Sequence, residues 1–85
     1  MPVEVTLDAR ELEPPEPFER ASEIVRQLQP GHYLRMLHRR VPYPLFDYCQ
    51  PLSLDHAVIE DGDALYQILI YFPQDEQALR RAGVL

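Results

Sequence analysis

Lysine is absent from this sequence of 85 residues, and its eight basic residues are all arginines, set against 14 aspartates and glutamates. The formal net charge of −6 argues against a protein that binds nucleic-acid backbones, because such proteins need a clustered excess of basic residues. Arginine suits bidentate contacts with carboxylates and phosphates better than diffuse attraction. We therefore expect no nucleic acid among the partners.

Cysteine and glycine are scarce as well. The single cysteine, Cys49, excludes an internal disulfide framework, and the three isolated glycines form no phosphate loop or dinucleotide motif. No apolar run approaches the ~18 residues of a membrane span, and the first residues resemble no signal peptide. The sequence thus predicts a cytoplasmic protein with no membrane contact and no cofactor.

The hydrophobic content of 46% is enough for one folded domain, which we expect over residues 1–85 with a core at about 3–72 and a C-terminal extension at 73–85. Period-two alternation and helical periodicity indicate the elements within it. Strands are expected at 3–8, 32–38, 54–60 and 64–72, helices at 18–28 and 43–49, and a short third helix at 75–82. Pro14, Pro15 and Pro17 mark the start of the first helix.

The order strand-helix-strand-helix-strand-strand predicts an α+β fold, a two-layer α/β sandwich with a mixed four-stranded sheet and two helices on one face. The last strand is the most hydrophobic, so we expect it to be central or covered on both faces. The phase of the third strand stays open, because both of its faces carry apolar residues. The Asp61-Gly62 pair predicts a hairpin turn before the last strand.

The second face of this sheet is expected to be open and half apolar. Such a face often meets a partner protein or a second copy of the chain, although scattered apolar surface residues are also normal. A homodimer through this face is therefore one expectation, and the C-terminal extension has no assigned role. The face comprises Glu4, Thr6, Tyr33, Arg35, Leu37, Gln67, Leu69 and Tyr71.

The segment LDARELEPPEP (residues 7–17) resembles the strand-turn-helix motif of the TusA-like (SirA-like) sulfur-carrier family, in which Leu-Asp and Gly-Leu lead into Cys-Pro-x-Pro. QLQPGHYLRMLHRR and ALYQILIYF are similar to the family's second and last strands with their flanking turns. More specifically, the chain resembles the TusA-like group known as domain of unknown function family 2249. The resemblance covers roughly residues 3–72 and implies the same two-layer fold.

The carrier cysteine of that family is missing from this chain. When Pro15-Glu16-Pro17 is aligned with Pro-x-Pro, the cysteine position holds Pro14, and Glu11 replaces the glycine of Gly-Leu. Proline has no thiol, so it can neither accept nor pass on sulfur. The resemblance therefore implies a retained scaffold that has lost its nucleophile.

Three further groups of side chains are candidates for chemistry. His38, Arg39 and Arg40 follow the second strand and precede a helix, a place where α/β sheets hold ligands, and Arg10 could converge on the same end. This group suits a small anion or an acidic partner, or it is a solvated basic turn. Glu11, Glu13 and Glu16 could serve acid–base chemistry or hold a cation, or they complement the helix dipole.

The remaining candidates are the histidines and Cys49. His32, His38, His56 and Cys49 show no ligand-like spacing, so we expect no metal site. Cys49 is either a displaced sulfur carrier or redox thiol, or a small core residue among aromatic and aliphatic neighbours. No Ser-His-Asp pattern is present, so no residue is a convincing nucleophile.

We thus expect no enzyme but a TusA-like accessory or interaction module that contacts a protein partner. The expected contact residues are Arg10, Glu11 and Glu13, together with the Arg39-Arg40 turn. Two alternatives stay open. One is sulfur or redox transfer through Cys49 or a partner's thiol, and the other is binding of a small anion or cofactor at His38-Arg39-Arg40.

Overall fold

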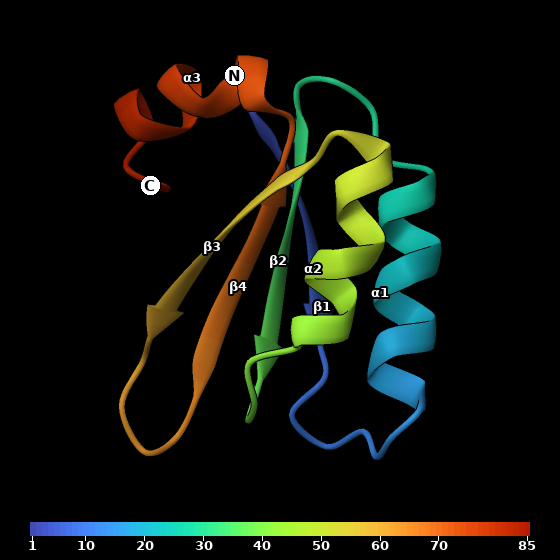
Figure 1. Ribbon diagram of the computed structural model, residues 1–85. Helices are drawn as coiled ribbons and strands as arrows, with labels where there is room; N and C mark the ends of the chain where they lie inside the picture. The colour runs from blue at the N-terminus through green and yellow to red at the C-terminus, as the bar shows by residue number, and fades with distance from the viewer.

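The computed structural model describes residues 1–85. Its centre is a four-stranded sheet with the order β1-β2-β4-β3, in which β1 and β2 run parallel and the other neighbours run antiparallel (Figure 1). The strands are β1 (Val3–Asp8), β2 (His32–His38), β3 (Asp55–Glu60) and β4 (Tyr66–Tyr71). The sheet is therefore mixed, as the sequence predicts.

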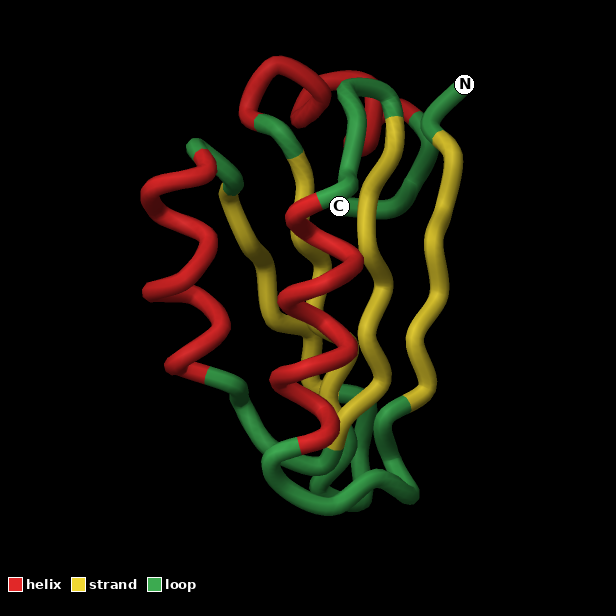
Figure 2. Tube along the Cα trace, turned by 90° about the vertical axis from the view of Figure 1, so that its right-hand side faces the viewer, coloured by secondary structure: helices red, strands yellow, loops and turns green.

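The helices form the second layer. The two longest, α1 and α2, lie side by side on one face of the sheet (Figure 1), and Figure 2 shows them running alongside each other. None of the helices is both long enough and apolar enough to cross a bilayer. Their bounds are α1 (Glu16–Arg26), α2 (Tyr43–Cys49) and α3 (Glu76–Arg81), with short 3₁₀ turns at Gln50–Leu52 and Pro73–Asp75. The predicted two-layer sandwich is confirmed.

Prolines begin both helices of this layer. Pro17 lies in the first turn of α1 and Pro44 in the first turn of α2, where a backbone N–H would have no partner in any case. Helix α1 starts two residues before the expected position and ends at Arg26 rather than Leu28. It ends there because Gln27 and Leu28 turn the chain towards β2, each donating its N–H to a carbonyl three residues back.

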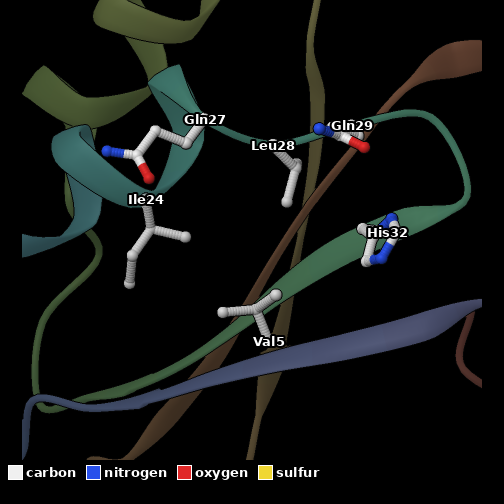
Figure 3. A pocket seen from close by; sticks show the side chains of 6 residues that line it. All are labelled: Val5, Ile24, Gln27, Leu28, Gln29 and His32. Atoms are coloured by element: carbon white, nitrogen blue, oxygen red, sulfur yellow. The ribbon is translucent and has the colours of Figure 1, made fainter.

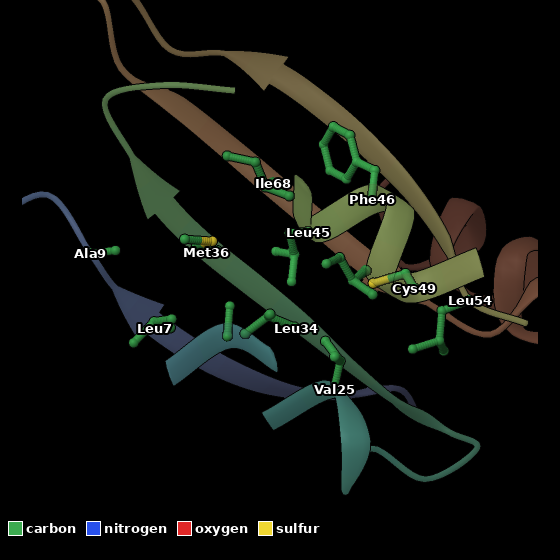
Figure 4. Close-up of a cluster of buried hydrophobic side chains, with 12 residues drawn as sticks. Leu7, Ala9, Val25, Leu34, Met36, Leu45, Phe46, Cys49, Leu54 and Ile68 are labelled. Atoms are coloured by element: carbon green, nitrogen blue, oxygen red, sulfur yellow. The ribbon is translucent and has the colours of Figure 1, made fainter. Parts of the chain in front are cut away.

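The main core lies between this helix layer and the sheet (Figure 4). The faces of β1, β2 and β4 that point towards the helices follow the expected alternation. Leu7, Leu34 and Ile68 on these faces all belong to the main core. Twelve buried residues form this core: Leu7, Ala9, Ala21, Val25, Leu34, Met36, Leu45, Phe46, Cys49, Leu54, Ile68 and Ile70.

The two strands at the C-terminal end of the sheet differ in exposure. β4 is central, and its residues 68–70 are fully buried, which confirms the expectation that this strand is covered on both faces. β3 is an edge strand, and its register decides the phase that the sequence left open. Val58 pairs with Ile68 on the helix face, whereas Ala57 pairs with Leu69 on the other.

The hairpin between these strands is present but longer than a two-residue turn. The Asp61 N–H donates to the Leu65 carbonyl, and the Leu65 N–H donates to the Gly62 carbonyl. Gly62 and the two residues after it all have positive φ, a conformation that glycine adopts without steric cost. Residues 62–65 belong to the loop, so β4 begins at Tyr66 instead of Ala64.

The second face of the sheet is not open, so the expectation of an open, half-apolar face is wrong. Tyr33, Leu69 and Tyr71 on this face are buried beneath Leu79 of α3, which is itself 1% exposed. The carboxylate of Asp75, just before α3, accepts a hydrogen bond of 2.7 Å from the Gly31 N–H. The C-terminal extension therefore covers the apolar part of this face.

The uncovered part of the same face is mostly polar and internally bonded, although Leu37 and Ile59 are partly exposed on it. The Tyr33 hydroxyl and the Arg35 Nε both donate to Oε1 of Glu4 over 2.9 Å, and Arg35 also donates to Gln67. These contacts pair one carboxylate with one guanidinium across strands β1 and β2. A homodimer through this face stays a prediction, but α3 covers most of the apolar surface on which it rested.

Candidate functional site

Two loops meet where the parallel strands β1 and β2 end (Figure 1). The Ala9 N–H donates to the Leu37 carbonyl over 2.8 Å, and Nε of Arg39 donates to the Arg10 carbonyl over 3.0 Å. Arg10 and the 38–40 turn, which are far apart in sequence, thus lie side by side. The structure brings the predicted basic residues to one end of the sheet, beyond the strands' carboxyl termini.

The three arginines at this end differ in their partners. Arg10 forms an ion pair with Asp8 over 2.7 Å, and its hydrogen bonds lower the pKa of the Asp8 carboxyl to about 2. Arg39 lies 3.8 Å from a carboxylate oxygen of Glu11, whose side chain is 90% exposed. Arg40 takes part in no ion pair or side-chain hydrogen bond. Of the three guanidinium groups, only that of Arg40 is without a partner inside the chain.

A cavity of about 400 Å³ opens between the starts of α1 and α2, at the end of β2. Five of its eleven lining residues are prolines, and the only titratable ones are His38 and Arg40. Proline fixes φ, so these walls have little conformational freedom to lose when something binds. The lining residues are Pro14, Pro15, Pro17, Phe18, Met36, His38, Arg40, Val41, Pro42, Pro44 and Leu45.

His38 presents a polar atom without a partner. Its Nδ1 is buried and makes no hydrogen bond. Burial lowers the pKa of His38, and the positive charge of Arg40 lowers it further, although a hydrogen bond with the backbone of Ala9 acts in the opposite direction. At neutral pH the ring is therefore mostly uncharged.

The carboxylates of this region lie outside the cavity. Glu13, Glu16, Glu19 and Glu23 surround a separate hollow that shares only Pro14 and Pro15 with the cavity. Glu16 is paired with Arg20 over 2.7 Å, and Glu11 points to Arg39 instead. No group of three or more His, Cys, Asp or Glu residues is placed to hold a metal ion. Stabilisation by the helix dipole is sufficient to explain the acids at the start of α1.

The other two histidines lie elsewhere. His32, at the opposite end of β2, lines a hollow of about 380 Å³ with Val5 and with Gln27 and Gln29 beyond α1 (Figure 3). His56 stacks on Phe46 with ring centroids 3.7 Å apart. The sequence carried no signal for the His32 hollow, because its walls come from three separate segments.

Cys49 is fully buried at the end of α2, within the main core (Figure 4). Burial raises the pKa of its thiol to about 11, so almost none of it is thiolate at neutral pH. The expectation that Cys49 is a core residue is confirmed.

Position 14 lies at the cavity wall. The chain passes it through a cis peptide bond between Pro14 and Pro15, and no residue that lines the cavity carries a thiol, a hydroxyl or a carboxylate. The sequence indicated His38 and Arg40 as site residues, but it did not indicate the apolar walls of the cavity. The prolines that begin both helices were the available signal for them.

The profile of one protein family, described as "Uncharacterized conserved protein (DUF2249)", matches residues 6–71. No curated protein and no solved structure matches the chain. The matched segment runs from within β1 to the end of β4 and includes every residue that lines the cavity, but not α3. Because the match covers well over half of the 85 residues, the chain belongs to the DUF2249 family.

Proposed function

We propose that this protein is a non-catalytic binding module with a TusA-like fold, which recognises another molecule at the carboxyl end of β1 and β2. The observation that supports this most is the cavity between the two helix starts. It combines apolar, proline-rich walls with one neutral histidine and one unpaired arginine. Concave, largely apolar sites with a few polar groups are typical of small-molecule binding.

The same cavity argues against the sulfur-carrier chemistry of TusA-like proteins. In the alignment with that family, Pro14 occupies the place of the persulfide cysteine, and it lies on the cavity wall. The only thiol of the chain, Cys49, is buried in the core with a raised pKa. We therefore propose that the scaffold binds a ligand where its relatives carry sulfur.

A protein partner stays a prediction. The surface that we expect it to contact is the pair of loops beside the cavity, where Glu11 and Arg39 are both largely exposed. Arg10 belongs to this surface but is held by Asp8, so it contributes less free charge than the sequence suggested. A partner that covers these loops would also cover the mouth of the cavity.

A fragment screen by two-dimensional amide NMR tests the binding module. We expect hits to shift the amide signals of residues 18, 36–41, 43 and 45 and to leave the α3 signals unchanged. Persulfide loading, followed by intact mass after treatment with a polysulfide donor, tests the alternative. A gain of sulfur by the folded protein that is lost in Cys49→Ser would contradict the proposal, as would hits that avoid the cavity altogether.

A further inference from the structure

We infer that the cavity binds a small monocarboxylate with a flat apolar body, whose carboxylate pairs with Arg40. This inference rests on the proposed function and names the class of ligand. It depends on three features of the site: the available charge, the shape and composition of the walls, and the acidic surroundings.

Arg40 is the cation that this end of the sheet leaves free. Arg10 is paired with Asp8, Arg39 with Glu11, and Arg20 of the neighbouring hollow with Glu16. A guanidinium group binds a carboxylate through two parallel hydrogen bonds, which gives both strength and orientation. Arg40 lines the cavity, so a carboxylate held by it lies at the cavity wall.

His38 lies on the same wall, so its ring senses charge that is placed in the cavity. Its buried Nδ1 has no partner within the chain, and a buried polar atom without a hydrogen bond is costly. A carboxylate near Arg40 favours protonation of this ring, because a negative charge raises a histidine pKa. His38 should therefore take up a proton more readily when the site is filled.

The walls favour a compact apolar body. Apart from His38 and Arg40, the lining residues are prolines and other apolar residues, including the aromatic ring of Phe18. A volume of about 400 Å³ lies at the small end of the range for ligand sites, so a single ring with one or two substituents fits with room left beside it. The fixed φ of the prolines keeps this space open before binding.

The surroundings limit the ligand to one negative charge. Glu13 and Glu16 line the hollow on the other side of Pro14 and Pro15, and the chain as a whole carries −6. Like charges nearby disfavour a dianion, and only one unpaired guanidinium is present to neutralise it. The site therefore fits a monocarboxylate better than a phosphate or a nucleotide.

Amide NMR titrations of the whole protein with benzoate, benzamide and inorganic phosphate test this inference. We expect saturable shifts around the cavity with benzoate, weaker ones with benzamide and none with phosphate. Arg40→Gln should weaken benzoate binding about tenfold or more, the usual loss when a charged hydrogen bond is removed. Arg26→Gln is the matched control, because Arg26 is an exposed arginine at the other end of α1.

The nitrogen signals of the His38 ring supply an independent readout. They should shift towards the protonated form in the wild-type protein when benzoate binds, and less so in Arg40→Gln. Arg40 is exposed and has no internal partner, so this variant should fold, which its spectrum will show directly. Equal binding of benzoate and benzamide, preferential binding of phosphate, or unchanged affinity in Arg40→Gln would each overturn the inference.

Failure of the inference can be told apart from failure of the proposed function. If neutral fragments shift the cavity residues and benzoate does not, the monocarboxylate is wrong while a binding cavity is supported. If no probe of either kind shifts these residues, the inference and the proposed function both fail.

Discussion

Replacing Leu79 with alanine should destabilise the protein by about 3 kcal/mol. Leu79 is 1% exposed and packs on Tyr33, Leu69 and Tyr71. The change removes three buried carbons, which costs roughly 2.4 kcal/mol at about 0.8 kcal/mol each, and the remaining cavity adds to this. The added cost is modest, because α3 is a short terminal helix that can move inward.

Urea denaturation followed by circular dichroism measures this loss. A protein of this size has a free energy of unfolding of roughly 4–13 kcal/mol, so a change of about 3 kcal/mol moves the midpoint clearly. Leu52→Ala is the matched control, because Leu52 is 37% exposed and should tolerate the substitution with little change.

Tyrosine titration gives a second readout of the same contact. Burial raises the pKa of Tyr71, with the nearby carboxylates of Glu76 and Asp55 acting in the same direction. If α3 loosens in Leu79→Ala, the phenol becomes hydrated and should ionise at lower pH in an ultraviolet titration. A loss below about 0.5 kcal/mol, together with an unchanged Tyr71 titration, would refute the packing of the C-terminal extension on the sheet.

Three further predictions concern titratable groups. Cys49, whose buried thiol has a pKa of about 11, should react with a thiol reagent at neutral pH far more slowly than it does in urea, and rapid labelling of the native protein would contradict its core position. Folding lowers the pKa of His38, so as the pH falls the unfolded chain takes up a proton before the folded chain does. Stability should be greatest above pH 6.5 and fall as the pH drops towards the folded-state pKa of His38. Urea midpoints at several pH values measure this dependence, and His38→Gln should make it weaker. Asp8 has a folded-state pKa of about 2, so the stability contributed by its contact with Arg10 should be present above about pH 4 and be lost as the pH falls towards 2. Carboxyl NMR titration measures this directly, and Arg10→Gln should return the Asp8 pKa towards 3.8.

Local patterns were sufficient for most of the secondary structure. Val5 and Leu7 alternate with polar residues, and a period of two places them on the helix face wherever the strand lies in the sheet. Pro17 and Pro44 locate helix starts, because proline tolerates only the first turn. These signals depend only on a few neighbouring residues, so they predict the elements without knowledge of the fold.

Local patterns could not decide which side of β3 faces the helices or where α3 packs. Residues 54–60 are apolar on both sides, so only pairing with β4 decided which side faces the helices. The short helix over 76–81 was expected, but its site on the second face depends on Leu79 meeting Tyr33, from a strand more than 40 residues earlier. Contacts at such separation leave no local periodicity.

The candidate site shows the same division. His38 and Arg40 were found because they end a strand before a helix, a local pattern. The sequence could not distinguish Arg40 from Arg39, because the contacts of Arg39 with Glu11 and the Arg10 carbonyl arise from the way the β1–α1 loop lies on the β2–α2 turn. The ion pair of Arg10 is local, with Asp8 two residues earlier.

The sequence by itself determined the order of elements and the faces of the first two strands, because each follows from the residue type at a given spacing. Tertiary structure decided three other things: that the C-terminal extension covers the second face, that Arg40 alone among the three clustered arginines is free, and that prolines from two loops enclose one cavity. Those outcomes arise where segments remote in the chain pack together, and packing and charge pairing across such distances depend on the whole fold.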